Sequence, residues 1–85
     1  MVCTKAVTVR LPDGLHHQAA TRFIQTANNF ACTIRISCGE NSVNAKSLLG
    51  VLSLSIGTGA QVTLTADGPD AEDALQALEQ CLLAV

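Results

Sequence analysis

One segment of this 85-residue chain alternates strictly between apolar and polar side chains over seven consecutive positions. The segment reads Cys32-Thr33-Ile34-Arg35-Ile36-Ser37-Cys38. Because successive side chains of a β-strand point to opposite faces, this alternation predicts a strand with one buried face and one solvated face. A sheet with one apolar face needs a second layer to cover it, so we expect the helices of the chain to lie there.

Shorter patterns predict the other elements of this two-layer arrangement. Strands are expected over residues 6–11, 42–44 and 61–66. Apolar residues spaced by three and four predict helices over 16–28 and from Asp70, as N-cap, almost to the C-terminus. With a short helix over 47–54, the order β-α-β-β-α-β-α predicts a single α+β domain spanning residues 1–85. Its four strands are expected to form a mainly antiparallel sheet with three helices on one face.

Composition excludes several classes of partner. Apolar residues make up 48% of the chain, which suits the efficient core that so short a domain needs. The net charge is −2, and Phe23 and Phe30 are the only aromatic residues, so no nucleic-acid partner is expected. No apolar run approaches the roughly 18–20 residues that span a bilayer. We therefore expect a soluble chain with no membrane insertion and no signal peptide.

The four cysteines do not have the spacing of a metal site or a disulfide pair. They are Cys3, Cys32, Cys38 and Cys81, and no two of them form a C-x-x-C motif. On one strand, Cys32 and Cys38 would lie about 20 Å apart, far beyond the reach of a disulfide. No histidine is near a cysteine in the sequence, so no zinc site is indicated. We predict buried, reduced thiols in a cytoplasmic protein.

Two adjacent histidines stand at the predicted start of the first helix. A helix N-terminus has unpaired amide hydrogens and the positive end of the helix dipole, so it favours anions. A neutral imidazole nitrogen of His16 can accept a phosphoryl group there, which those amides then bind. The alternative is that His16 and His17 are surface residues of a turn. Metal binding is not indicated, because neighbouring side chains on a helix diverge and no third ligand is near.

Ser47 stands at the start of another predicted helix, and two roles are open to it. Serine is a common N-cap, because its hydroxyl accepts a hydrogen bond from the first turn. A phosphoryl group on the same hydroxyl would put negative charge against the helix N-terminus, where the fold tolerates it while a partner is blocked. Residues 47–54 are apolar around most of the helix circumference, so we expect an exposed apolar patch beside Ser47.

Three segments of the chain each match part of a known family pattern. They read Gly14-Leu15-His16, Phe23-Ile24-Gln25-Thr26-Ala27 and Asn44-Ala45-Lys46-Ser47-Leu48-Leu49-Gly50-Val51-Leu52-Ser53-Leu54. These segments resemble HPr, the histidine phosphocarrier of the bacterial sugar phosphotransferase system, and the resemblance covers nearly the whole chain. It implies an open-faced β-sandwich in which His16 carries a phosphoryl group from enzyme I to sugar-specific enzyme IIA domains. It also implies that Ser47 is a regulatory phosphorylation site.

The chain departs from that family at the start of the first helix. The family segment reads Gly-Leu-His-Ala-Arg-Pro-Ala, and this chain reads Gly14-Leu15-His16-His17-Gln18-Ala19-Ala20. An arginine fork binds phosphoryl oxygens bidentately, whereas Gln18 offers only a neutral donor. We predict transfer slower by roughly one to two powers of ten, or a different partner. A protonated His17 would supply part of the missing charge.

The resemblance leaves two functions from different classes. The first is a phosphocarrier, not an enzyme, that needs no cofactor and forms a phosphohistidine at His16. The second is a regulatory protein that is phosphorylated on Ser47 by an HPr kinase/phosphorylase and binds a transcriptional repressor, with little transfer through His16. A small-molecule-binding or metabolic enzyme domain is less well supported, because the charged residues do not cluster into an acid–base pair.

The predicted docking surface combines apolar and basic residues, and a monomer is expected. Its members are Leu48, Leu49, Val51, Leu52, Arg22 and Lys46. The two bases suit acidic partner surfaces. Residues 1–66 carry five bases and two acids, whereas residues 67–85 carry five acids and no base. The side of the molecule that meets partners is therefore expected to be mildly basic, and the last helix acidic.

Overall fold

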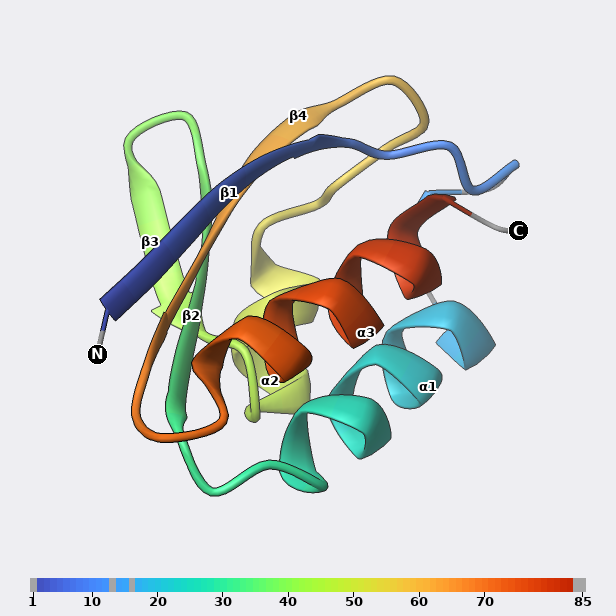
Figure 1. Cartoon of the computed structure of the whole chain (residues 1–85). Helices are drawn as coiled ribbons and strands as arrows, with labels where there is room; N and C mark the ends of the chain where they lie inside the picture. Colours follow the sequence, from blue (N-terminus) through green and yellow to red (C-terminus); the bar gives the residue numbers. More distant parts are fainter. Residues whose placement is uncertain (1, 13, 16, 84–85) are drawn as a thin grey trace.

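The computed structural model describes residues 2–12, 14–15 and 17–83, with His17 described for its backbone only. The elements follow in the predicted order (Figure 1). They are β1 (Val2–Thr8), α1 (His17–Asn28), β2 (Thr33–Cys38), β3 (Asn41–Asn44), α2 (Leu48–Ser53), β4 (Gln61–Asp67) and α3 (Ala71–Leu83).

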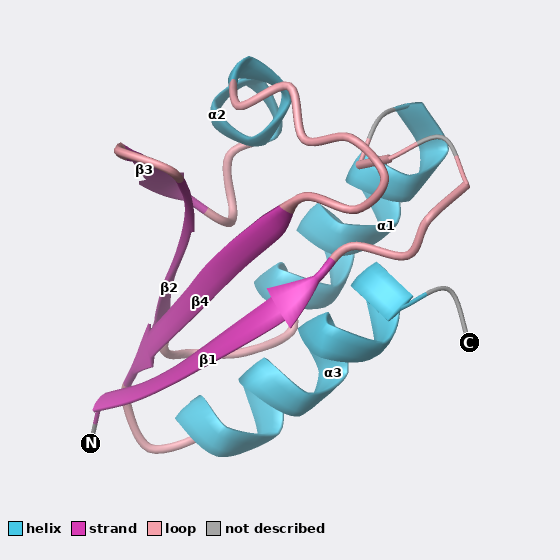
Figure 2. Ribbon diagram, turned by 90° about the horizontal axis from the view of Figure 1, so that it is seen from above, coloured by secondary structure: helices cyan, strands magenta, loops and turns pink. Residues whose placement is uncertain are grey.

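The four strands form one antiparallel sheet in the order β1-β4-β2-β3. Figure 2 shows α1 and α3 side by side along one face of this sheet, with α2 near β3. The other face carries no helix and is covered by polar side chains such as Thr33 and Arg35, which are exposed. The predicted open-faced α+β sandwich is therefore confirmed.

The core lies between the sheet and the helices. The alternation in β2 places Ile34 and Ile36 in it, both fully buried, and β4 adds Val62 and Leu64. Phe23 of α1 is the largest fully buried side chain. Burial of each such side chain stabilises the fold by about 1.5–3 kcal/mol. The two alternating strands thus contribute four buried side chains to the core between the sheet and the helices.

The first strand is displaced from its predicted range of 6–11. β1 runs from Val2 to Thr8 and pairs with β4 over its whole length. It is an edge strand, and most of its residues are exposed, so the apolar alternation that identifies a half-buried strand is missing from its first half. Val9 and Leu11 belong to the following loop, in which Val9 is fully buried.

Asp70 stands directly before α3, but its carboxylate does not serve the predicted capping role. Its two oxygens accept hydrogen bonds from the amides of Ala31, at 2.8 Å, and Cys32, at 3.0 Å. These amides belong to the loop between α1 and β2, so Asp70 fastens that loop to the start of α3. The correction has a simple physical reason: the loop brings two amides within reach of the same carboxylate.

The four cysteines are free thiols. Cys32 is buried, whereas the other three are half-buried, so the expected full burial holds for one of them only. Burial raises the pKa of the Cys32 thiol, and the neighbouring Asp70 carboxylate raises it further. The thiol therefore stays protonated and behaves as a small apolar side chain.

Candidate functional site

The chain approaches α1 through a tightly constrained segment that includes Gly14 and Leu15. Gly14 has a φ of +74°, and a Cβ atom placed there would lie 2.5 Å from the carbonyl oxygen of Ile56. A larger residue would both strain the backbone and collide with that carbonyl. Leu15 is fully buried, and its amide donates to the same carbonyl at 2.9 Å. The residue that precedes His16 in the chain is thus fixed by packing and by a hydrogen bond.

The segment that follows α2 holds the same loop from another side. The Val9 amide donates to the carbonyl of Ala60 at 2.8 Å, and the Gly59 amide donates to the carbonyl of Val9 at 2.8 Å. The Thr58 hydroxyl contacts the carbonyl oxygens of Leu11 and Pro12. These contacts join the loop before α1 to the segment leaving α2, so the two form one region of the molecule.

Three residues are predicted to meet the phosphoryl group, and the structure describes two of them, at the start of α1. His16 lies outside the described residues. His17 is the first residue of α1, and Gln18 follows it with an exposed side chain. The first turn holds no acidic side chain. An anion bound to its amides would therefore meet no opposing negative charge from this turn.

Ser47 is the N-cap of α2, as predicted. Its backbone is extended, and its hydroxyl accepts a hydrogen bond from the Gly50 amide at 3.2 Å. Asn44 ties the preceding turn, because its side-chain oxygen accepts from the Lys46 amide at 2.9 Å and its carbonyl accepts from the Ser47 amide at 3.1 Å. The side chain of Ser47 is half-buried. Its hydroxyl thus already takes part in holding the helix.

The exposed apolar patch exists, but it is smaller than predicted. Leu48 is 41% exposed and Leu49 is 81% exposed, and Leu52 is half-buried. Val51 is fully buried, which corrects its prediction as a docking residue. The reason is geometric: Val51 lies on the side of α2 that faces the core, where a partner cannot reach it. We call Leu48, Leu49 and Leu52 the apolar patch.

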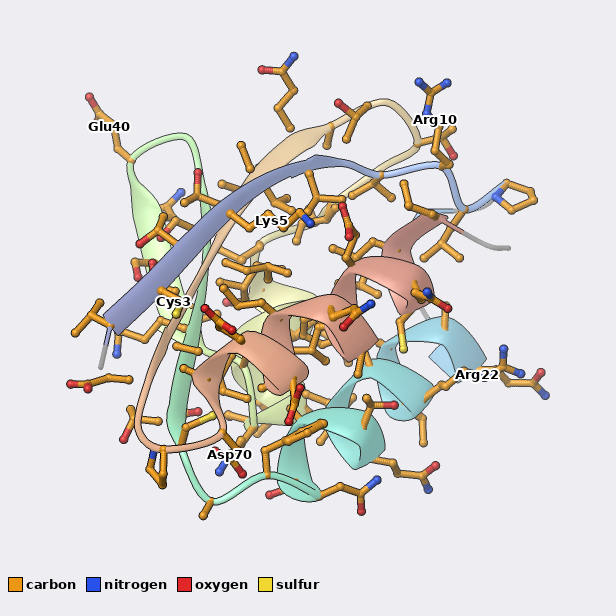
Figure 3. The ribbon with its side chains drawn as sticks, in the orientation of Figure 1. Cys3, Lys5, Arg10, Arg22, Glu40 and Asp70 are labelled. Carbon is orange, nitrogen blue, oxygen red and sulfur yellow. The ribbon has the colours of Figure 1, made fainter. Side chains whose placement is uncertain are left out.

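The two bases of the predicted docking surface differ in what they contact. The Lys46 ammonium donates to the carbonyl of Phe30 at 2.7 Å, so it ties the start of α2 to the end of α1. Arg22 is exposed on α1 (Figure 3). Its guanidinium has no hydrogen bond or ion pair within the described part of the chain.

Comparison with known proteins gives this site a context. The family described as PTS HPr component phosphorylation site matches residues 3–83. The chain belongs to the HPr family. The HPr-like protein Crh of Halalkalibacterium halodurans is 43% identical over 74 residues, which cover 87% of this chain and 88% of that protein.

Solved HPr and Crh structures have the same fold. The phosphocarrier protein HPr of Bacillus anthracis matches with a TM-score of 0.93 and 44% identity, covering 95% of this chain and 96% of that one. Crh of Bacillus subtilis matches with a TM-score of 0.78 and 40% identity, covering 92% of this chain and 90% of that one. The predicted family and fold are confirmed, and the chain is similar to both kinds of HPr relative.

A groove on this HPr-like protein lies away from α2, between β1 and α3. It has a volume of about 510 Å³ and is lined by Cys3, Thr4, Lys5, Glu72, Leu75, Gln76 and Glu79. The Lys5 ammonium crosses it to Glu79 at 2.9 Å. No sequence pattern indicates this groove, because its two walls are more than 60 residues apart in the chain.

Two kinds of feature are absent from the part of the chain that the structure describes. No three side chains among the His, Cys, Asp and Glu residues of that part gather as they would around a metal ion. Of the helices described, none has the length and apolar character needed to cross a membrane.

Proposed function

We propose that this HPr-like protein is a phosphocarrier, in which His16 accepts a phosphoryl group from enzyme I and passes it to enzyme IIA domains. The observation that carries the proposal is the construction of the segment before His16. Gly14 and Leu15 are both fixed against the carbonyl of Ile56, at the entry to a helix whose first turn holds no acid. Membership of the HPr family supports the same role.

The transfer needs no cofactor. A lone pair on a neutral imidazole nitrogen of His16 attacks phosphorus, and the bond from phosphorus to the donor breaks with its electron pair left on the donor. In the second transfer, a nucleophile of the next protein attacks the same phosphorus, and the bond from phosphorus to the His16 nitrogen breaks with its electron pair left on the imidazole. The amides of the first turn of α1 favour the negative charge of the carried group. The protein is therefore a carrier with a covalent intermediate.

The apolar patch would dock both partners. Leu49 is 81% exposed, and a partner that covers it would remove this apolar surface from water, which favours binding. Arg22 is available to an acidic partner surface, whereas Lys46 is already engaged with Phe30. We therefore assign docking chiefly to Leu48, Leu49, Leu52 and Arg22.

The carrier function is tested by labelling with phosphoenolpyruvate and a cognate enzyme I. The wild-type protein should acquire an acid-labile, base-stable label, and His16→Ala should lose it. His17→Ala is the matched control, since it removes the neighbouring imidazole and should keep the label. An unlabelled wild-type protein beside an active enzyme I would rule out the carrier function.

A second candidate function, regulation through Ser47, is favoured by a specific observation. Ser47 lies beside the exposed Leu48 and Leu49, and Gln18 replaces the arginine that the family uses at the start of α1. Phosphorylation of Ser47 would put a charge of about −1.5 to −2 next to the apolar patch. Such a charge would change which partner, carrier enzyme or transcriptional repressor, binds there.

The regulatory function is tested with ATP and an HPr kinase/phosphorylase. It predicts an acid-stable label that is lost in Ser47→Ala. Ser53→Ala is the matched control, because Ser53 is an exposed serine of the same helix whose hydroxyl donates to the carbonyl of Gly50. Label on Ser47 with negligible label on His16 would identify regulation as the main role.

We propose further that the protein acts as a cytoplasmic monomer. The solved Crh of Bacillus subtilis is described as a swapped, intertwined dimer, so the oligomeric state needs a direct test. β1 is the first element of the chain and is held in the sheet along one side only, by β4, so a second copy could exchange it. Sedimentation at several concentrations should give the mass of one chain. A dimer that persists on dilution would overturn this proposal.

A further inference from the structure

We propose that Arg22 supplies the cation that binds the phosphoryl group on His16, in place of the arginine that this chain lacks at position 18. The inference rests on the proposed phosphocarrier function and names a further residue of the same site. In this reading Arg22 touches the carried group itself, which is a different role from docking a partner.

The helical position of Arg22 is the first argument. Arg22 follows Gln18 by four residues on α1, so both side chains lie on one face of the helix. At a rise of about 1.5 Å per residue their Cα atoms are about 6 Å apart along the axis. Helical side chains lean toward the N-terminus, so the long side chain of Arg22 extends over the turn that contains Gln18. Figure 3 shows it beside this half of α1.

The availability of the guanidinium is the second argument. Arg22 is exposed, and within the described residues its side chain forms no hydrogen bond or ion pair. Only its backbone carbonyl is engaged, by the Thr26 hydroxyl at 2.9 Å. No acid of the first turn competes for it. The fork is therefore ready to bind an anion without first leaving another partner.

The other bases of the chain are placed elsewhere, which is the third argument. Three of the five contact other parts of the fold: Lys5 pairs with Glu79 at 2.9 Å, Arg35 donates to Ser42 at 3.1 Å, and Lys46 donates to Phe30 at 2.7 Å. Figure 3 shows the fourth, Arg10, pointing away from α1. Arg22 is the base that α1 itself presents near its first turn.

The transfer assay gives the first test. With phosphoenolpyruvate and enzyme I, Arg22→Gln should form phosphohistidine about tenfold more slowly than the wild type, because a neutral donor replaces a charged one. Gln18→Arg added to Arg22→Gln should restore the rate, since it returns a guanidinium to the same helix face. Arg10→Gln is the matched control, with the same loss of charge at an exposed site away from α1, and should keep the wild-type rate.

A second measurement separates phosphoryl binding from docking. Phosphoramidate, a small phosphoryl donor, can load His16 without enzyme I. A cation beside the phosphoryl group favours its more charged form and lowers the pKa of its second ionisation. The ³¹P titration of phosphorylated Arg22→Gln should therefore give a higher pKa than that of the wild type, and Arg10→Gln should match the wild type.

The outcomes are distinct. A wild type that takes no label from either donor ends the carrier function and this inference together. A labelled wild type whose ³¹P titration is unchanged in Arg22→Gln leaves the carrier function standing and overturns the inference, even if transfer from enzyme I is slower, because Arg22 then serves docking alone. A raised pKa with rescue by Gln18→Arg supports it.

Discussion

The start of α2 is built from residues that are close in the chain, whereas the start of α1 is held by residues far away in it. Ser47 caps α2 through the Gly50 amide, and Asn44 ties the turn before it. Before α1, in contrast, the Leu15 amide donates to the carbonyl of Ile56, more than 40 residues later, and Gly14 packs closely against the same carbonyl. A histidine precedes α1 in the sequence, and histidine is not a favoured N-cap residue.

The two candidate phosphorylation sites would therefore respond differently to added charge. At α2 the Ser47 hydroxyl already accepts a hydrogen bond, so phosphorylation changes a structural contact. At α1 the backbone is positioned by packing and by Ile56, which leaves the amides of the first turn for an incoming anion. A phosphoryl group at the start of α1 would therefore meet amides of the first turn, whereas one on Ser47 would alter a hydrogen bond that already exists.

The largest effect is expected when the distant support of α1 is broken. Gly14→Ala should lower the free energy of unfolding by about 2–4 kcal/mol, because it adds a positive-φ penalty to a clash with Ile56. It should also slow labelling of His16 while labelling of Ser47 continues. Urea unfolding and the two labelling assays measure both effects.

Gly39→Ala is the matched control for that substitution. Gly39 has a similar φ of +63°, but a Cβ atom there would have no neighbour within 4 Å. Its loss should be only about 1–2 kcal/mol, from the backbone alone. Equal losses at the two glycines would show that the Ile56 contact does not hold the start of α1.

The next effect concerns the two sides of α2. Val51→Ala should cost about 2 kcal/mol of stability, because Val51 is fully buried, and should leave partner contacts intact. Leu49→Ala should change stability by less than about 0.5 kcal/mol, because Leu49 is 81% exposed, and should weaken binding of enzyme I. Thermal unfolding and titration calorimetry separate the two. A destabilised Leu49→Ala with unchanged binding would contradict the assignment of the apolar patch.

The sequence was informative where contacts are local or periodic. The alternation over 32–38 predicted a half-buried strand, and β2 is one; the serine before an apolar run predicted the cap of α2. The pattern failed at β1, an exposed edge strand whose pairing with β4 has no apolar signature. For α2, residues apolar around the whole circumference do not reveal which side meets the core, and so Val51 was assigned wrongly.

The contacts that position the candidate site join segments far apart in the chain, and such contacts cannot be predicted from a local sequence pattern. The carbonyl of Ile56 against Gly14 and Leu15, and the carboxylate of Asp70 against Ala31, are backbone approaches between distant segments. Neither depends on a residue pattern within one segment. Gly14 is the one visible sign of these contacts in the sequence, because a glycine in a turn before a helix often marks a positive φ or a close backbone approach.

A smaller effect is expected at the cap of α2. Ser47→Ala should lower the free energy of unfolding by about 1 kcal/mol, because the Gly50 amide loses its acceptor. Ser47→Asp should recover most of this, since aspartate is also a good N-cap and its charge suits a helix N-terminus. Ser47→Ala, which adds no charge beside the apolar patch, should leave the labelling of His16 unchanged. Urea unfolding of the three proteins measures the difference; a wild-type stability in Ser47→Ala would refute the local support of α2.

The smallest change in stability at neutral pH is expected from a substitution of Asp70. Its carboxylate binds the loop that follows the C-terminal end of α1. The hydrogen bond from the Ala31 amide, followed by those from Cys32, holds the pKa of the Asp70 carboxyl below its ordinary value of 3.8. Since the folded pKa is the lower one, the stabilisation is complete above about pH 4 and is lost as the pH falls through the folded value. Unfolding in urea between neutral pH and about pH 2.5 should show this loss.

In Asp70→Asn the part of the stability loss in acid that comes from Asp70 should be missing, because the asparagine side chain has no carboxylate to protonate. Asp73→Asn is the matched control, since it removes an exposed carboxylate from the first turn of the same helix, and should keep the wild-type dependence on pH. Identical acid profiles for Asp70→Asn and the wild type would show that this carboxylate does not fasten the end of α1. The Lys46 ammonium on the carbonyl of Phe30, at 2.7 Å, would then be a remaining polar contact at the end of α1. Both ends of α1 would still be held by residues far away in the chain, unlike the locally capped start of α2.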